Sequence, residues 1–351
     1  MNTTLQSLPD LGWTPFYQSQ LSLEECESHQ PLRVTEVHRN KLDTLGAAGP
    51  EQVPMTGEFA DHGVAVGDWV LVETSTRRPV RILDRKSLLQ RRAAGNEPSA
   101  QLIAANIDTL LITSSCNADF NPARLERYLA LALQAGVDPV IVLTKADLAD
   151  DPDDYRHRAE AIMRGVLVEV INAKSEDVSN RLAPFCAKGR TVALLGSSGV
   201  GKSTLTNALT GDDAATQAVR EDDAKGRHTT TARSMHRTRA GGWLVDTPGM
   251  RELRLFDAGE GLDEVFGDIL SLAEECRFND CAHETEPGCA IQAAIAEGKL
   301  DPDRLRRWQK LLREDRHNTE SVAEHRARSR GMNKLYRDGQ ARGRAKRSDP
   351  G

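Results

Sequence analysis

An apolar run passes through a glycine-rich turn into a helical pattern at Thr191-Val-Ala-Leu-Leu-Gly-Ser-Ser-Gly-Val-Gly-Lys-Ser-Thr204, and this change of pattern indicates an α/β fold. Residues 191–195 are typical of a strand buried on both faces, and 203–209 of a helix. Residues 196–203 match G-x-x-x-x-G-K-[ST] in the strand–loop–helix context that this pattern needs. Its glycines let backbone N–H groups close around phosphate oxygens. The sequence therefore predicts a phosphate loop made of Gly196, Ser197, Ser198, Gly199, Val200, Gly201, Lys202, Ser203 and Thr204.

The loop supplies two groups for phosphate chemistry. The Lys202 ammonium would reach the β- and γ-phosphates of a nucleotide, so this lysine is a catalytic candidate, and the Ser203 hydroxyl would coordinate Mg²⁺. Asp246-Thr-Pro-Gly249 follows another apolar run. We expect Asp246 to hold the same Mg²⁺ through water and the Gly249 N–H to sense the γ-phosphate.

A candidate switch segment lies between these two motifs, at Gly226-Arg-His-Thr-Thr-Thr231. One of its three threonines would coordinate Mg²⁺ when the γ-phosphate is present. The sequence leaves the choice open, and we take Thr230 as the expected ligand.

Two further strand ends carry a pattern for reading the base. Thr144-Lys145-Ala146-Asp147 ends an apolar run, and an aspartate there can accept two hydrogen bonds from guanine, whereas adenine offers no such pair of donors. Asp147 could instead open the acidic turn that follows it. A second run ends in a segment that resembles the guanine-supporting loop of GTPases, with Asn172, Ala173 and Lys174.

The rest of the chain from about residue 100 alternates strands and helices, as in a doubly wound α/β domain. Apolar runs at 107–113, 139–143, 166–171 and 243–245 are expected to be strands of a parallel sheet. Asn121-Pro122 should begin a helix that ends at Gly136. Before this part, 31–92 contains short β-rich runs, including 67–73 and 80–83, which fit a small barrel such as an OB fold.

The motifs stand in an unusual order. Ordinary GTPases carry the phosphate loop, the switch threonine and D-x-x-G before [NT]-K-x-D and the guanine-supporting loop, but here the last two come first. This order, with G-S-S-G-V-G-K-S-T, G-R-H-T-T-T and D-T-P-G-M, makes about residues 30–325 resemble the circularly permuted GTPase family of small ribosomal subunit biogenesis.

The resemblance implies a multidomain α/β protein. Its expected parts are an OB-like RNA-binding barrel (31–95), a circularly permuted GTPase domain (96–255) and a zinc-binding helical domain (256–325). Residues 1–30 show little pattern, so we expect a loosely packed N-terminal extension, and the Gly-, Arg- and Ser-rich 326–351 should be a basic, disordered tail. It also implies hydrolysis of GTP to GDP, slow alone and faster on the small ribosomal subunit, whose late maturation the protein would assist.

Catalysis needs a group that positions the attacking water. Met250 follows D-T-P-G where Ras-like GTPases place a glutamine, so intrinsic hydrolysis should be slow. His228 is the nearest candidate for this role, although it could instead be an exposed switch histidine that contacts RNA or phosphate. Two other functions stay open: an ATP-dependent kinase, which Asp147 disfavours, and a guanine-nucleotide sensor that binds RNA with negligible catalysis.

Four residues near the C-terminus could hold a metal. Cys276-x₄-Cys281-x-His283-x₅-Cys289 offers three thiols and one imidazole, the donor set of a structural zinc site. The spacing alone is irregular, and the same R-F-N-D-C-x-H-x-x-E-P-G-C context occurs in the resembled family. The alternative is three buried thiols that lie near a histidine by chance.

Composition limits the remaining classes. The 351 residues are 39% apolar and carry a net charge of −6, which is typical of globular domains and argues against bulk nucleic-acid binding. Two segments are nonetheless basic: 77–92 has seven Lys or Arg and one acid, and 325–347 has nine and one. The sequence shows neither a signal peptide nor a membrane-length apolar run. We therefore expect a cytoplasmic protein with no membrane partner, and a monomer, because no heptad or large apolar patch is visible. The resemblance implies that it binds GTP and GDP and that its macromolecular partner is the small ribosomal subunit with its rRNA.

Overall fold

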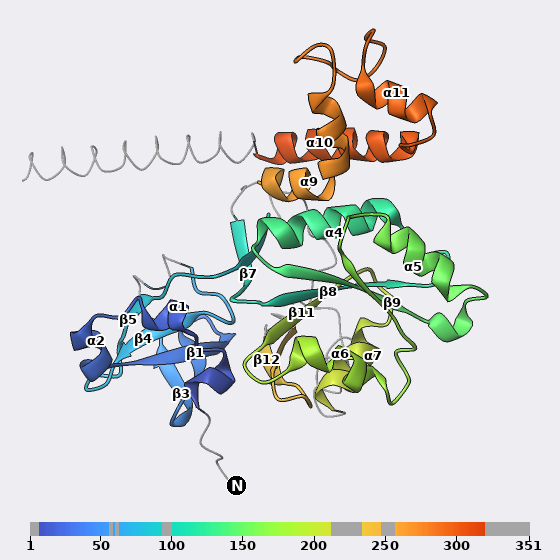
Figure 1. Cartoon of the computed structure of the whole chain (residues 1–351). Coiled ribbons are helices and arrows are strands. Elements are labelled where there is room, and N and C mark those ends of the chain that lie inside the picture. Colours follow the sequence, from blue (N-terminus) through green and yellow to red (C-terminus); the bar gives the residue numbers. More distant parts are fainter. Residues whose placement is uncertain are drawn as a thin grey trace, which may run out of the picture.

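The computed structural model describes residues 7–55, 59, 63–92, 100–211, 234–246 and 257–319. These residues form an N-terminal β-rich unit, a central α/β sheet and a C-terminal group of helices that lies against one face of the sheet layer (Figure 1). Within these ranges no helix is long and apolar enough to cross a membrane.

The central sheet contains five parallel strands in the order β10-β9-β8-β11-β13. Strand β12 is next in the order after β13 and pairs with it in the antiparallel direction. Every residue of β8 and β11 is buried, as the apolar runs predicted. The strands are β8 (Thr109–Ser115), β9 (Asp138–Thr144), β10 (Leu167–Val170), β11 (Thr191–Leu195), β12 (Ser234–Arg237) and β13 (Trp243–Asp246).

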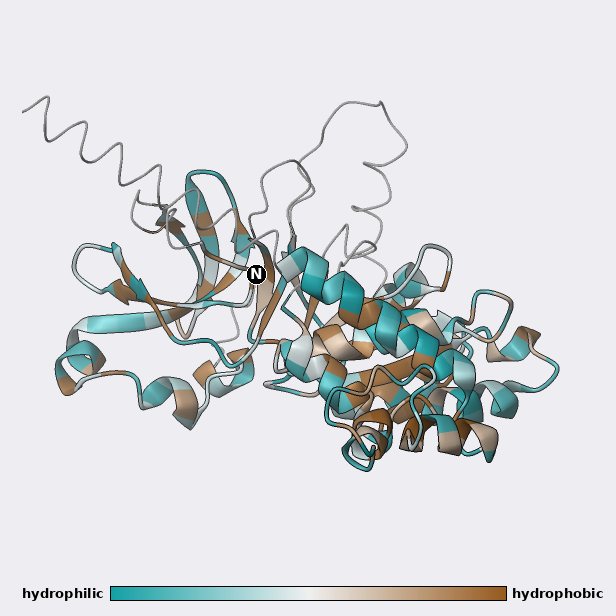
Figure 2. Ribbon diagram, turned by 90° about the horizontal axis from the view of Figure 1, so that it is seen from above, coloured by the Kyte–Doolittle hydropathy of each residue, from teal (hydrophilic) through white to brown (hydrophobic). Residues whose placement is uncertain are grey.

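Helices cover both faces of this sheet, so the doubly wound expectation is confirmed. Helices α4 (Pro122–Gln134) and α5 (Pro152–Glu160) lie on one face, and α6 (Val178–Cys186) and α7 (Lys202–Thr210) on the other (Figure 1). The Asn121 side chain accepts a hydrogen bond from the Arg124 N–H and so caps α4. Hydrophobic colour concentrates on the strands and on the helix faces that cover them (Figure 2).

The N-terminal β-unit is built from five antiparallel strands in the order β3-β2-β1-β4-β5. This order is that of a partly open, five-stranded barrel. Trp69 of β4 is fully buried, and its ring packs against that of Trp13 in the preceding segment at a centroid distance of 4.8 Å. The strands are β1 (His29–Val37), β2 (Lys41–Gly46), β3 (Gly49–Pro54), β4 (Trp69–Glu73) and β5 (Pro79–Ile82).

The segment before β1 is not loosely packed, so that expectation was wrong for residues 7–28. It forms η1 (Leu8–Leu11), α1 (Pro15–Gln18) and α2 (Leu23–Ser28). Tyr17 is 2% exposed, and its ring centroid lies 5.8 Å from that of Trp69. The buried Arg33 guanidinium donates to the carbonyl oxygens of Leu11 and Asn106. The segment therefore fills the space between the β-unit and the central sheet.

The β-unit and the central sheet are continuous through hydrogen bonding. Glu36 of β1 pairs with Ser234 of β12, so one sheet runs from β10 to β3. A separate hairpin joins β6 (Leu88–Arg92) to β7 (Ala100–Ala105). The expected boundary between 95 and 96 falls between these two paired strands, in residues outside the described ranges.

The C-terminal helices pack on α4. They comprise α9 (Gly259–Val265), α10 (Gly267–Glu274), α11 (Ala290–Ala296) and a helix over 302–319. Gly261 lies so close to α4 that a Cβ there would meet the Ala130 carbonyl oxygen at 2.1 Å. Close backbone approach of this kind requires glycine.

Candidate functional site

The phosphate loop (residues 196–203) joins β11 to α7, as predicted. Gly199 and Gly201 have φ values of +79° and +98°, which favour glycine. A Cβ at Gly196 would lie 2.3 Å from the Thr113 carbonyl oxygen at the end of β8. The glycines thus allow the loop to turn tightly over the end of the sheet.

Lys202 is tied to the start of the loop. Its Nζ donates to the carbonyl oxygen of Gly196 at 2.7 Å and to that of Ser197. Ser203 is exposed in the first turn of α7, and Val200 is buried beneath the loop. This arrangement leaves the Ser203 hydroxyl accessible to a ligand at the N-terminus of a helix.

The base-recognition segment (residues 144–147) contacts the phosphate loop directly. The Thr144 hydroxyl lies 2.5 Å from the Val200 carbonyl oxygen, to which it donates. Lys145 has a φ of +58° and starts η2 (Ala146–Leu148). Asp147, at the end of this segment, is exposed.

The guanine-supporting segment (residues 172–174) lies beside them. The Ala146 N–H donates to the Ile171 carbonyl oxygen at 3.3 Å, which joins the two strand ends. Asn172 Oδ1 accepts from the Lys174 N–H at 3.0 Å and so shapes the turn. Ala173 is buried and Lys174 is exposed. Three segments far apart in the sequence therefore meet at the carboxyl edge of one parallel sheet, where α/β proteins bind ligands.

Asp246 ends β13 at the same edge, because β13 runs parallel to β11 with Val245 beside Ala193. Its side chain is not among those described. The expected positions of His228, Thr230, Gly249 and Met250 lie outside the described residues.

Asp119 and Arg124 were missed by the sequence reasoning, although they touch the phosphate loop. Arg124 Nη1 donates to Ser197 Oγ at 2.6 Å, and Ser197 Oγ donates to Asp119 Oδ2 at 2.9 Å. The ion pair between Arg124 and Asp119 closes the triangle at 3.1 Å. The only sequence signal was Asn121-Pro122, which predicts a helix start near them but not a contact with a residue more than 70 positions away.

The four predicted metal ligands come together in the C-terminal domain. One donor atom from each of Cys276, Cys281, His283 and Cys289 lies within 4.8 Å of the others, so the cluster could hold a metal ion. His283 Nδ1 lies 3.6 Å from both Cys276 Sγ and Cys289 Sγ, which lie 3.9 Å apart. Burial opposes ionisation of the Cys276 thiol, but N–H groups of Ala290 and Ile291 lower its pKa overall.

Known proteins resemble this chain over most of its length. The family model described as RsgA GTPase matches residues 82–256. A relative from Mesorhizobium japonicum, named small ribosomal subunit biogenesis GTPase RsgA, is 51% identical over 89% of this chain and 91% of its own length. A relative from Vibrio parahaemolyticus, named small ribosomal subunit biogenesis GTPase RsgA 2, is 48% identical over 96% of this chain and 93% of its own.

Two solved structures share the fold. YjeQ from Thermotoga maritima is 24% identical, with a TM-score of 0.59 over 82% of this chain and 98% of its own. YloQ, described as a circularly permuted GTPase, is 22% identical, with a TM-score of 0.58 over 83% and 96%. The permuted order of motifs read from the sequence agrees with this likeness. The chain belongs to the RsgA family of circularly permuted GTPases.

Proposed function

We propose that this protein hydrolyses GTP to GDP and phosphate and assists late maturation of the small ribosomal subunit. The observation that carries the proposal is the meeting of the phosphate loop with the base-recognition and guanine-supporting segments at one sheet edge. This chain matches nine-tenths or more of the length of relatives named small ribosomal subunit biogenesis GTPases, which supports the same role here.

The phosphates would lie over the loop at the N-terminus of α7. Backbone N–H groups of residues 196–204 would surround them, and Lys202 would neutralise charge on the β- and γ-phosphates. Ser203, Thr230 and Asp246 are the proposed ligands of Mg²⁺, Asp246 through water. Bound Mg²⁺ would supply charge stabilisation during phosphoryl transfer, and Gly249 would contact the γ-phosphate.

The base would be recognised by residues 144–147 and 172–174. The exposed Asp147 carboxylate can accept hydrogen bonds from N1–H and the 2-amino group of guanine. Adenine would leave that carboxylate without partners, so ATP should be a poor substrate. Replacing Asp147 by alanine should weaken GTP binding by at least about tenfold, the factor that 1.4 kcal/mol gives.

Activation of water is assigned to His228 in this proposal, since Met250 cannot orient water by hydrogen bonding. Because Met250 predicts slow hydrolysis, we also test a second function: a guanine-nucleotide sensor that binds RNA with negligible catalysis. Full particle-stimulated turnover by His228→Ala would remove histidine from the mechanism. The absence of stimulated turnover in the unaltered protein would favour the sensor.

Zinc is the metal that best fits the cysteine–histidine cluster. Tetrahedral bonds of about 2.3 Å to sulfur and about 2.0 Å to nitrogen place two sulfurs about 3.8 Å apart and sulfur about 3.5 Å from nitrogen. The observed 3.9 Å and 3.6 Å agree with these separations. Three thiols and one imidazole complete a closed, structural coordination shell, which would staple the loop between α10 and α11.

The flanking units are the proposed contacts with rRNA, with the basic 77–92 segment running from β5 of the β-unit to β6 of the neighbouring hairpin. Strand β12 begins just after the 226–231 switch candidate and pairs with β1 of the β-unit, and the C-terminal helices rest on α4. Nucleotide state would thereby change the relative angle of the two units. We propose a cytoplasmic monomer. Identical X-ray scattering with GDP and with a GTP analogue would contradict this coupling.

The experiment is GTP turnover with and without purified small ribosomal subunits, with ATP as the control nucleotide. GTP-specific stimulation by the particle supports the proposal. Turnover of ATP at the same rate would favour the kinase alternative.

A further inference from the structure

The loop between β8 and α4 places an ion pair against the phosphate loop. The Asp119 carboxylate and the Arg124 guanidinium both hydrogen-bond the Ser197 hydroxyl, at 2.9 and 2.6 Å. Ser197 is held a second time through its carbonyl oxygen, which accepts from the Lys202 ammonium. One residue of the phosphate loop thus connects the predicted phosphate-binding lysine to the Asp119–Arg124 pair.

The loop that carries Asp119 is itself fixed. Asn117 Oδ1 accepts from the Asp119 N–H at 2.9 Å and from the Ser115 hydroxyl at 2.8 Å. The next residue, Phe120, is 8% exposed, and its ring lies 5.4 Å from that of Tyr155. The backbone around Asp119 is therefore held in place, so little conformational entropy is lost when the Asp119 carboxylate accepts the hydrogen bond from Ser197.

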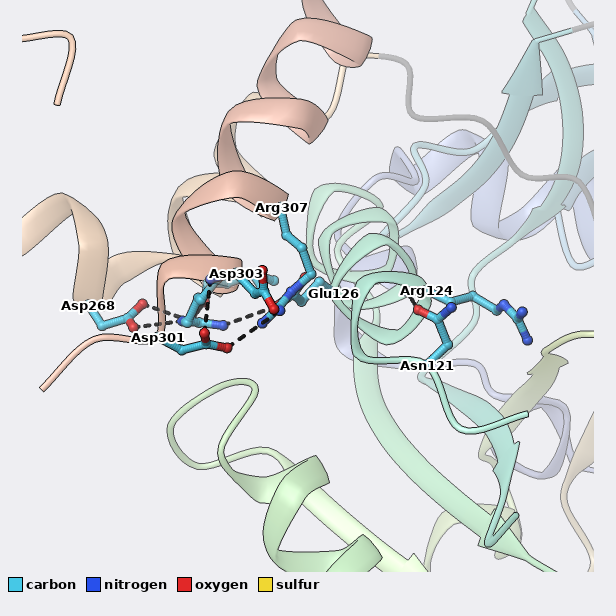
Figure 3. A network of polar contacts seen from close by, with 9 residues as sticks. Asn121, Arg124, Glu126, Asp268, Asp301, Asp303 and Arg307 are labelled. Carbon is cyan, nitrogen blue, oxygen red and sulfur yellow. Dashed lines mark hydrogen bonds and ion pairs between the residues drawn. The ribbon is translucent and has the colours of Figure 1, made fainter. Parts of the chain in front are cut away.

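Arg124 lies on one side of α4, and the opposite side of α4 packs against the C-terminal helices. Arg124 and Glu126 point to opposite sides of the helix, with Glu126 directed into a cluster of charged residues from the C-terminal helices (Figure 3). The Glu126 side chain is fully buried and contacts Arg307 Nε at 2.8 Å. This anchor fixes the rotation of α4 and hence the direction of Arg124.

We propose that Asp119 and Arg124 are positioning residues that hold the phosphate loop through Ser197 and thereby slow the release of GDP. The inference rests on the proposed function, because it requires residues 196–203 to bind the phosphates. Partial burial opposes ionisation of Asp119, but hydrogen bonds from Arg124 and Ser197 lower its pKa overall. The Asp119 carboxylate is therefore charged at neutral pH and pairs with the Arg124 guanidinium.

The direction of the effect follows from loop order. A phosphate loop held in its binding conformation loses little freedom when nucleotide binds, whereas an unbraced loop must be ordered at that moment. Changes of this kind act mainly on dissociation. Hydrogen bonds to charged groups are also stronger than those between neutral groups. The contacts of Asp119 and Arg124 with Ser197 should therefore contribute more free energy than an ordinary exposed ion pair.

The test measures release of N-methylanthraniloyl-GDP from the full chain by stopped-flow fluorescence. Arg124→Ala and Ser197→Ala should each speed release about tenfold, the factor that 1.4 kcal/mol gives. The double variant should be no faster than either single variant, because the residues act as one unit. Arg124→Lys, which keeps the charge but not the planar fork, should restore part of the slow release.

The matched control is Arg190→Ala, which breaks the ion pair of an exposed arginine with Asp108 in the same domain, before β11 and thus at the end of that strand opposite the phosphate loop. It should leave GDP release unchanged, and thermal melting should show that every variant is folded. Release from folded Arg124→Ala at the unaltered rate, or effects of the two single variants that multiply, would overturn the inference. If the unaltered protein does not bind the probe at all, the proposed nucleotide site is wrong and the inference falls with it.

Discussion

Replacing Glu126 by glutamine should loosen the C-terminal helices from α4. The Glu126 carboxylate is fully buried and accepts from Arg307 at 2.8 and 3.0 Å and from Arg304 at 3.3 Å. Arg304 also donates two hydrogen bonds of 2.7 Å to the Asp268 carboxylate. The substitution removes the central negative charge and leaves two guanidinium groups facing an amide.

Breaking a buried ion pair by removing one partner destabilises by about 3–5 kcal/mol. We take the lower end, about 3 kcal/mol, because Arg304 keeps Asp268 and the glutamine oxygen can still accept a bond. The opening equilibrium of the C-terminal helices should then rise by more than about a hundredfold, at 1.4 kcal/mol per factor of ten.

Amide hydrogen exchange read by mass spectrometry checks this prediction on peptides that cover 258–274. Their protection should fall in Glu126→Gln, while that of β8 and β9 should hardly change. The matched control is Glu169→Gln, whose exposed ion pair with Arg181 should contribute less than about 1 kcal/mol. Unchanged protection of 258–274 in a folded Glu126→Gln protein would refute the reasoning.

Three further predictions concern the cysteine–histidine cluster, the phosphate loop and the ion pair between Glu25 and Arg81. Cys281→Ser should lose bound zinc, measured by atomic absorption, because one of four ligands is removed. Gly196→Ala should abolish nucleotide binding, measured by calorimetry, because its Cβ would lie 2.3 Å from a backbone oxygen. Hydrogen bonding to Arg81 lowers the pKa of Glu25 to about 2, so this pair stabilises the fold above about pH 4.5. That contribution, about 1 kcal/mol, should disappear in urea titrations as pH falls toward 2.

Each prediction has a control that leaves the contact intact. Cys26→Ser changes an exposed cysteine and should keep zinc. Gly165→Ala adds a Cβ into open space at a φ of +81°, so it should cost about 1 kcal/mol of stability without affecting binding. Glu24→Gln should keep the acid dependence that Glu25→Gln removes. Retained zinc in Cys281→Ser, normal binding by Gly196→Ala, or an unchanged pH profile for Glu25→Gln would contradict the respective account.

The central sheet could be predicted because its signal is local. Strands β8, β9 and β11 are runs of apolar residues buried on both faces, and each predicted motif follows the end of a strand. Parallel strands bring their carboxyl ends to one edge, so the motifs that follow those strands were expected to lie close together. The cysteine–histidine cluster was predictable for a similar reason, since Cys276 and Cys289 lie within one short stretch of sequence.

The N-terminal segment could not be predicted in the same way. Leu11 and Tyr17 follow no helical or strand period, and their burial depends on Trp69 and Arg33, which come later in the chain. The contacts of Asp119 and Arg124 with the phosphate loop were missed for a related reason. Nothing in the spacing of Asp119 and Arg124 indicates that Ser197 lies between them, because that contact arises only when β8 and β11 pair.

The most direct test of the central claim is the rate of GTP turnover with and without purified small ribosomal subunits, at two salt concentrations. A GTPase that lacks its activator can be slower by about 10⁵-fold. We predict strong stimulation by the particle that requires GTP, is absent with ATP and weakens at high salt. Slow turnover that the particle does not change would contradict the proposed role and leave a guanine-nucleotide sensor.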